Sequence, residues 1–223
     1  MTRSESRFER KWNLDNLDIN NSKKIIYNSK FNFVEVFKKR KVNSIYFDSI
    51  SLKSIYENLD GHKFKKKYRL RWYGKTNYIL DPKFEVKSKI GFVTFKKTYN
   101  LKGIDNLPLC LDSLSKLKKI VNDLKISKTE LFPILCTHYD RLYYLSSNRL
   151  VRGTLDYNIQ STDLFKRYNY KFKKNFNRKI FELKYDTSLD SYVRNNIPSL
   201  FSRLTKSSKY IFSAIEKSNN YSF

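Results

Sequence analysis

The chain of 223 residues is strongly basic, since 46 Lys and Arg residues against 21 Asp and Glu residues give a formal net charge of +25 at pH 7. Its length allows one large domain with a substantial core, and its charge favours an anionic partner: nucleic acid, a membrane surface or a phosphate compound. An AT-rich genome would explain part of the lysine excess, because asparagine, isoleucine, phenylalanine and tyrosine are abundant as well.

The few cysteines and histidines argue against a zinc site or a disulfide framework. The chain has 2 Cys and 2 His residues, and Cys110 and Cys136 do not form a CxxC pair. We therefore predict that both cysteines are buried thiols. The sequence also lacks an apolar run of about 18 residues and an apolar signal segment at its N-terminus, so we expect a soluble cytoplasmic protein without a transmembrane segment.

The first part of the chain predicts short strands and two helices. Charged and apolar residues alternate over residues 7–12, which is typical of a strand, and residues 15–29 have an apolar stripe that predicts a helix. Alternation over residues 31–37 and again over 42–48 predicts two further strands, which we expect to be neighbours. A short helix is predicted over residues 52–59.

Residues 63–89 predict a hairpin with one strongly cationic face. The positions that alternate on this face are Lys67, Arg69, Arg71, Glu85, Lys87 and Lys89. The intervening Tyr68, Leu70 and Trp72 are apolar, as a strand packed on a core requires. Such a strand indicates a groove or barrel lined with positive charge, and the lining indicates a polyanion.

The rest of the chain repeats this pattern. Residues 93–98 predict a third strand that adds Lys96 to the cationic face, and residues 109–126 predict an amphipathic helix. Two strands joined by a turn at residues 146–148 follow, the second with Arg152 on its polar face. A last strand puts Glu182 and Lys184 on the charged side, and the tail is predicted to be helical in two pieces, the second capped by Ser207 or Ser208 and broken from the first near Pro198.

These elements predict an α+β fold: an antiparallel β-tunnel or barrel of about eight strands with a polar, cationic lumen and flanking helices. We expect a single domain over residues 1–223. Cations that share one lumen repel each other unless an anion compensates them, so the lining predicts several bound phosphates. Glu182, helped by Glu9 or Glu85, would suit a divalent metal ion, while the alternative for each glutamate is a salt bridge.

Several segments, in one order along the chain, carry a family resemblance: RFERKW, VNSIYFD, KYRLRWYG, FEVKSK with the following FKK, YDR, LVRGTLD, FELKY and KSSKY. Together they resemble the catalytic domain of the vacuolar transporter chaperone (VTC) family, in the triphosphate tunnel (CYTH-like) superfamily. The resemblance covers about Arg7 to about Ile215, with a terminal helix over 207–218. It implies an antiparallel β-tunnel that transfers the γ-phosphate of ATP to a growing inorganic polyphosphate chain with Mn²⁺ or Mg²⁺.

The resemblance also assigns roles to individual residues. It implies that Glu182 binds the metal ion and that Lys206 and Lys209 lie on a terminal helix that closes over the substrate. The phosphate-binding lining that it implies consists of Lys11, Arg69, Arg71, Lys87, Lys96, Arg141 and Arg152. Our predicted catalytic set is Arg69, Arg71, Lys87, Arg141 and Arg152, and the predicted substrate-binding residues are Lys11, Lys67, Lys96, Lys184, Lys206 and Lys209.

Two other functions are compatible with the sequence. A tunnel triphosphatase would release phosphate from a nucleotide or an RNA 5′ end, but Arg7 stands where the superfamily's ExExK pattern has its first glutamate. A non-catalytic module would bind polyphosphate or nucleic acid. Nucleic acid is disfavoured because the aromatic residues fall mostly on the core side of their strands. We expect ATP and inorganic polyphosphate or pyrophosphate as partners, and the sequence leaves a membrane partner open.

Overall fold

The structure is a computed structural model that describes residues 7–90, 93–101, 103–104, 106–164, 174–197, 204–205 and 207–218. Its strands are β1 (Arg7–Asn13), β2 (Val34–Asp48), β3 (Phe64–Tyr73), β4 (Tyr78–Ile79), β5 (Lys83–Ile90), β6 (Val93–Asn100), β7 (Leu107–Pro108), β8 (Phe132–Leu145), β9 (Arg152–Asp163), β10 (Lys174–Phe176) and β11 (Ile180–Asp186). Its helices are α1 (Ile19–Tyr27), α2 (Lys53–Leu59), α3 (Leu111–Asp123), the 3₁₀ turn η1 (Thr187–Leu189), α4 (Asp190–Asn196) and α5 (Lys209–Ser218).

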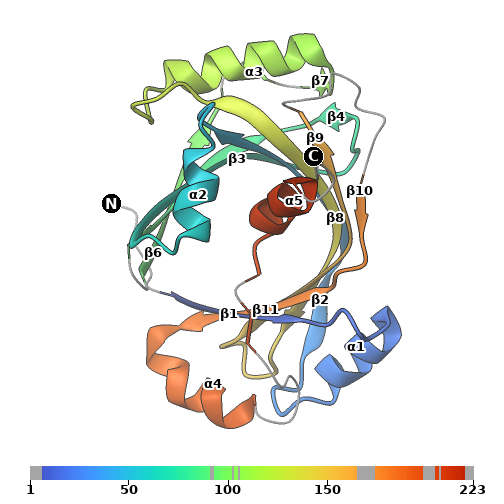
Figure 1. The fold of residues 1–223 in the computed structure, drawn as a ribbon. Helices are drawn as coiled ribbons and strands as arrows, with labels where there is room; N and C mark the ends of the chain where they lie inside the picture. Colours follow the sequence, from blue (N-terminus) through green and yellow to red (C-terminus); the bar gives the residue numbers. More distant parts are fainter. Residues whose placement is uncertain are drawn as a thin grey trace. The chain divides into compact units, whose positions relative to one another are not determined.

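The strands form one large, mainly antiparallel sheet (Figure 1). Its nine strands follow the order β1-β11-β9-β8-β2-β3-β5-β6, with β10 paired to β9, and β4 and β7 form a separate two-stranded sheet. The predicted α+β class with flanking helices is therefore confirmed. Within the described residues the pairing path ends at β1 and β6, so the sheet is open and not a closed barrel.

The chain divides into two compact units. Unit 1 contains residues 1–40, 139–159 and 176–207, and unit 2 contains residues 41–138, 160–175 and 208–223. Strands β2, β8 and β9 contribute residues to both units. The expectation of a single domain stays a prediction. None of the helices in the described part of the chain is long and apolar enough to span a membrane.

Unit 1 has a core on one face of β1, β11 and β9. Trp12, Phe181, Leu183 and Tyr185 are each at most 2% exposed, and they alternate with the charged residues of the same strands. Helix α1 begins after Asp18, whose side chain accepts a hydrogen bond from the Asn21 backbone, and it adds buried apolar residues to this core. The predicted core face of the last strand is thus confirmed.

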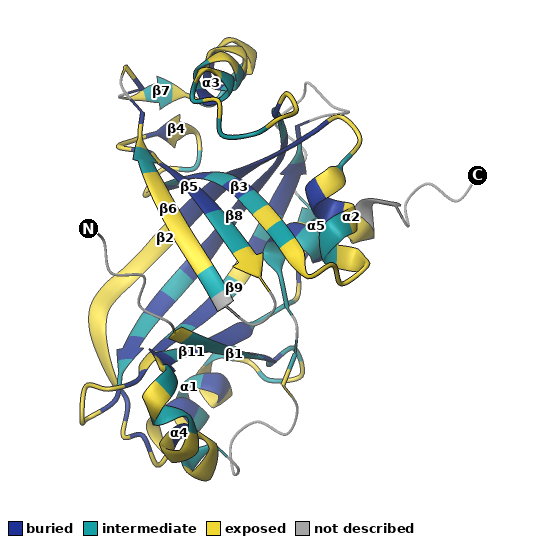
Figure 2. Ribbon diagram, turned by 90° about the vertical axis from the view of Figure 1, so that its left-hand side faces the viewer, coloured by how far each residue is buried: buried dark blue, intermediate teal, exposed yellow. Residues whose placement is uncertain are grey.

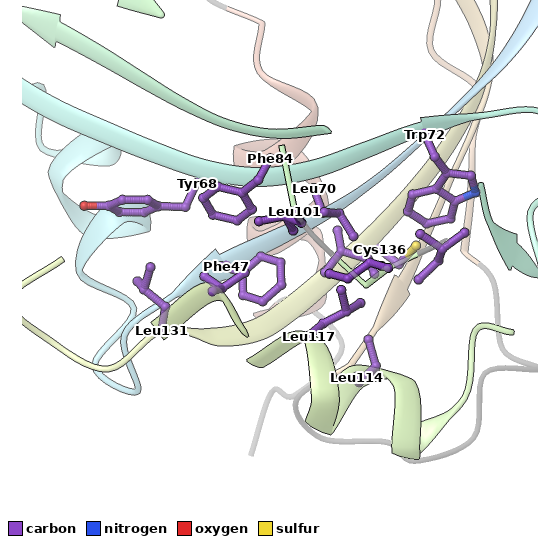
Figure 3. Packing of buried hydrophobic residues seen from close by; sticks show 14 of the residues in the cluster. Phe47, Tyr68, Leu70, Trp72, Phe84, Leu101, Leu114, Leu117, Leu131 and Cys136 are labelled. Carbon is purple, nitrogen blue, oxygen red and sulfur yellow. The ribbon is translucent and has the colours of Figure 1, made fainter. Parts of the chain in front are cut away.

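Unit 2 has its main core between the sheet and helix α3 (Figure 3). Leu70, Trp72 and Phe84 come from β3 and β5, while Leu114 and Leu117 come from the apolar stripe of α3. All of them are buried. The two-residue period of the strands and the three- to four-residue period of the helix therefore place apolar side chains in the same core, as the sequence predicts.

A second apolar cluster in unit 2 holds helices α2 and α5. Tyr210 of α5 stacks on Tyr46 of β2 with ring centroids 4.7 Å apart, and its hydroxyl donates a 2.7 Å hydrogen bond to Asp48. Asp48 also accepts hydrogen bonds from the backbone of Ser54 and Ile55, in the first turn of α2. This one buried carboxylate therefore stabilises the start of α2 and the position of α5.

The expectation of two neighbouring strands over residues 31–37 and 42–48 is wrong. Residues 34–48 form the single strand β2, and Phe31 and Phe33 precede it in the core of unit 1. Residues 34–41 are all exposed, which Figure 2 shows as the yellow first half of β2. The run Lys38–Lys41 does not interrupt the strand, because an extended backbone accommodates charged side chains wherever they reach water. The predicted turn at Gly91 and break near Pro198 lie outside the described residues.

Candidate functional site

Two clusters of charged side chains lie on the polar faces of the strands, one in each unit. We define cluster 1, in unit 1, as Glu9, Lys11, Arg141, Arg152, Asp156, Glu182 and Lys184. Cluster 2, in unit 2, consists of Lys67, Arg69, Arg71, Glu85, Lys87 and Lys96. Because side chains alternate across a strand, each cluster lies opposite the core residues of its own strands.

The register of β3, β5 and β6 brings the members of cluster 2 together. Arg69 is directly opposite Glu85, and Lys67 is directly opposite Lys87. Lys87 is in turn opposite Lys96 on β6. Directly opposed residues of an antiparallel pair point to the same side of the sheet, so three adjacent strands contribute to one charged face. The predicted cationic face of residues 63–96 is confirmed.

Glu85 is the centre of cluster 2. Its side chain is only 5% exposed, and its carboxylate accepts a 2.6 Å hydrogen bond from Arg69 Nε and lies 2.5 Å from Lys96 Nζ. Arg71 lies 3.8 Å away. Burial alone would raise the pKa of Glu85, but Arg69, Arg71 and Lys96 together lower it to about 2. Glu85 therefore stays ionised and holds the cations in position.

Replacing Glu85 with glutamine should destabilise the ligand-free protein by about 3 kcal/mol, because three neighbouring cations would lose their shared carboxylate. Tripolyphosphate should restore part of this stability, since it supplies the missing negative charge and should bind the folded protein more tightly than the unfolded chain. Thermal and urea denaturation with and without tripolyphosphate measure both effects. Glu130→Gln is the matched control, because Glu130 pairs with Lys118 at an exposed position.

The pH dependence of the wild type provides a second check on Glu85. Its pKa is lowered from 4.5 to about 2 on folding, so its stabilisation is complete above about pH 4.5 and is lost as the pH falls toward 2. Glu85→Gln should lack this contribution, so its free energy of unfolding should fall less steeply than that of the wild type as the pH decreases from about 4.5 toward 2. If Glu85→Gln is as stable as the wild type at neutral pH, and its free energy of unfolding falls equally steeply at acid pH, Glu85 does not hold the cations.

The register of β1, β11 and β9 assembles cluster 1 in the same way. Lys11 is opposite Glu182, and Glu9 is opposite Lys184. On the other side of β11, Lys184 is opposite Arg152. Lys184 Nζ lies 2.8 Å from Glu182 and 3.7 Å from Glu9, so one ammonium group lies near two carboxylates.

Glu182 is ionised in this environment. Its side chain is 9% exposed, and Lys11 Nζ lies 3.4 Å from the carboxylate. Burial raises its pKa, but Lys11, Lys184 and Arg141 outweigh burial and hold the pKa well below its ordinary value. Burial has the opposite effect on Lys11 and lowers its pKa. Glu182 and Glu9 outweigh burial, so the pKa of Lys11 lies above its ordinary value. The two groups therefore stabilise each other's charged form.

Arg141 and Asp156 form a buried, bidentate ion pair that the sequence did not predict. Arg141 Nε and a terminal nitrogen donate hydrogen bonds of 2.6 and 2.7 Å to the two carboxylate oxygens of Asp156. The Asp156 side chain is fully buried and that of Arg141 is 12% exposed. The alternating pattern of β9 places Asp156 on the polar face, but only the register between β8 and β9 identifies Arg141 as its partner.

The start of α5 contributes to unit 2. Ser208 Oγ accepts a hydrogen bond from Lys67 Nζ at 3.1 Å and another from the Ile211 backbone at 3.5 Å, which confirms Ser208 as the helix cap. Lys209 is the first residue of α5. Lys206, which the resemblance assigned to substrate binding, lies outside the described residues.

Few groups in the described part of the chain could hold a metal ion. No three His, Cys, Asp or Glu side chains gather there. Glu182 and Glu9 both lie near Lys184 Nζ, so two carboxylates already share a cation. Glu85 has three cationic neighbours, which favours an electrostatic role over metal binding. The assignment of metal ligands stays a prediction.

Comparisons with known proteins agree with this fold. The family model of the VTC domain matches residues 6–215. A proposed adenylate cyclase from Vibrio parahaemolyticus has 13% identity and a TM-score of 0.53, over 94% of this chain and 98% of that chain. A protein from Pyrococcus horikoshii has 12% identity and a TM-score of 0.50, over 95% and 99% of the two chains. At such identities the likeness shows the fold alone. No curated protein sequence matches the chain.

Proposed function

Because the chain belongs to the VTC domain family, we propose that it is a polyphosphate polymerase that transfers the γ-phosphate of ATP to a growing inorganic polyphosphate chain. The observation that carries this proposal is the composition of cluster 2, in which five cations share one sheet face with the single carboxylate of Glu85. Such an excess of positive charge is stabilised by a ligand with several negative charges. A chain of phosphates has this property.

The arginines of cluster 2 suit phosphoryl transfer. Arg69 and Arg71 alternate on β3, so both guanidinium groups are on the same side of the strand, where they would bind phosphate oxygens in a fixed geometry. Lys67, Lys87 and Lys96 would supply mobile positive charge along the chain. Phosphoryl transfer depends mainly on alignment and on neutralising the charge of the phosphate oxygens.

The acceptor for this reaction needs no nucleophile or general base from the protein. The terminal oxygen of a polyphosphate chain already carries a negative charge at neutral pH, so no proton has to be removed before it attacks the γ-phosphorus of ATP. The new P–O bond extends the polymer by one phosphate, and the bond to the β-phosphate breaks to release ADP. The absence of a catalytic histidine from the predicted site residues is consistent with this chemistry.

In this proposal, cluster 1 would hold the divalent ion that the family implies. Glu182 and Glu9 would hold Mn²⁺ or Mg²⁺, because carboxylate oxygens are ligands that these ions prefer. Both carboxylates already lie near the Lys184 ammonium group. A bound ion would neutralise charge on the phosphate oxygens. Arg141 and Arg152 would add positive charge to the same cluster.

A tunnel triphosphatase is the second candidate, and the contacts of both Glu9 and Glu182 with Lys184 Nζ favour it. Two carboxylates beside one cation could also hold a metal ion and position a water molecule for hydrolysis. The two reactions differ in the acceptor, because polymer synthesis uses a phosphate oxygen and hydrolysis uses water. Product analysis therefore distinguishes them.

The deciding experiment incubates the protein with ATP and Mn²⁺ or Mg²⁺, with and without a tripolyphosphate primer. Products are resolved on a gel, and free phosphate is measured in parallel. A ladder of long polymer that falls by about 100-fold or more in Glu182→Gln would support the polymerase. Glu130→Gln should still produce the polymer ladder, because it replaces a glutamate of an exposed ion pair with glutamine.

Two other outcomes would reject the polymerase. Release of free phosphate without a ladder would identify a triphosphatase. Tight binding of tripolyphosphate without turnover would leave a polyanion-binding module. Circular dichroism of Glu182→Gln is needed in each case, because loss of the Lys11 and Lys184 ion pairs would also lower activity if the variant failed to fold.

A further inference from the structure

A row of unsatisfied polar atoms crosses the charged face of unit 2 beside Arg71. Arg71 Nε and the hydroxyl groups of Ser44 and Thr137 are buried, and none of them has a hydrogen-bond partner among the described residues. Ser44 and Thr137 are completely buried residues. More than nine in ten buried polar groups in proteins have a partner, so three unsatisfied donors in one row require an explanation.

The strand register places these three residues side by side. Ser44 on β2 is directly opposite Arg71 on β3. The strand on the other side of β2 is β8, where His138 Nδ1 lies 2.7 Å from the Asn43 side chain. We infer from this contact that residues 43 and 138 pair, and that residues 44 and 137 pair next to them. Thr137, Ser44 and Arg71 therefore form a row across three strands, on the face opposite the apolar core.

The row leads from the interior to solvent. Thr137 and Ser44 are its buried end, and the Arg71 side chain is 13% exposed. Lys83, directly opposite Arg71 on β5, is exposed. All of these groups donate hydrogen bonds, and Arg71 Nε can only donate, so the complementary group is an acceptor with negative charge.

We propose that Ser44, Thr137 and Arg71 Nε form a binding position for the terminal phosphate group of a phosphate chain. The inference rests on the proposed function in taking phosphate as the ligand, and it adds two uncharged residues to the site. A phosphate group has enough oxygen atoms to accept a hydrogen bond from each of the three donors. Charge-assisted hydrogen bonds of this kind are stronger than those between neutral groups.

The proposal predicts opposite effects on stability and on ligand affinity. Without ligand, a buried hydroxyl that lacks a partner is unfavourable, so Thr137→Val and Ser44→Ala should leave the thermal unfolding midpoint unchanged or raise it. With ligand, each substitution removes one hydrogen bond to a charged group. We expect each variant to bind tripolyphosphate about tenfold more weakly than the wild type in isothermal titration calorimetry.

Two further variants complete the test. Thr137→Ser keeps the hydroxyl and should recover most of the affinity that Thr137→Val loses. Ser113→Ala is the matched control, because Ser113 is also buried in unit 2 but its hydroxyl contacts Cys110 at the start of α3. It should bind tripolyphosphate as the wild type does.

The outcomes separate this inference from the proposed function. If the wild type binds tripolyphosphate and the Ser44 and Thr137 variants bind it equally well, the terminal phosphate position is wrong and the proposed function stands. If the wild type does not bind tripolyphosphate, the proposed function fails as well. A large loss of stability in Thr137→Val or Ser44→Ala would also overturn the inference, because it would mean that the hydroxyl groups have structural partners.

Discussion

Replacing Arg141 with alanine should destabilise the protein by about 3–5 kcal/mol, the largest stability effect that we expect from one substitution. Arg141 donates two hydrogen bonds to Asp156, and the Asp156 side chain is fully buried. Without Arg141, the buried Asp156 carboxylate would lose the cation that donates both of these hydrogen bonds. Urea denaturation of the wild type and the variant measures this loss.

A double variant distinguishes a buried pair from a general loss of packing. Replacing Arg141 with methionine and Asp156 with leucine removes both charges and keeps much of the volume, so it should recover most of the stability. Equal stability of Arg141→Ala and the wild type would show that the ion pair does not support the fold.

Replacing Arg71 with alanine should lower kcat/KM for ATP by about 100-fold or more, since Arg71 is expected to stabilise charge on the transferred phosphoryl group. The fold should survive, because Arg71 is 3.8 Å from Glu85, which keeps its closer contacts with Arg69 and Lys96. Steady-state kinetics with a tripolyphosphate primer measures the effect, and thermal unfolding checks the fold.

The matched control for Arg71 is Lys119→Ala, which removes one positive charge from an exposed position on α3. It should retain nearly normal activity, since a change in overall charge far from a cluster acts only weakly through solvent. Near-normal activity of Arg71→Ala would remove Arg71 from the catalytic set. A similar loss in both variants would mean that net charge, and not the position of Arg71, determines the rate.

The sequence predicted the faces of strands better than their boundaries. The alternation of Arg69 and Arg71 with Leu70 identified both faces of β3, because successive side chains of any strand point to opposite sides. The same rule placed Glu182 on the charged face of β11. It failed for the start of β2, where exposed charged residues on both faces hide the period of the strand.

The sequence did not predict which charged residues contact each other. The alternating pattern placed Glu85 on the cationic face, but its three partners depend on the register of β3, β5 and β6. The turn predicted over residues 146–148 joins the strands of Arg141 and Asp156, but the sequence did not identify these two residues as partners. The bond from Tyr210 to Asp48 joins residues that are 162 positions apart.

What the sequence by itself determined was the basic character of the protein: its net charge, the cationic faces of its strands and its family resemblance. Each of these depends on composition or on backbone geometry over a few residues, so it can be recognised without knowing which strands are neighbours. Only the tertiary structure decided that Glu85 holds three cations, that Arg141 pairs with Asp156, and that Ser44 lies opposite Arg71. The physical reason is that ion pairs and hydrogen bonds act over a few ångströms, and strand register alone brings these distant residues within that range.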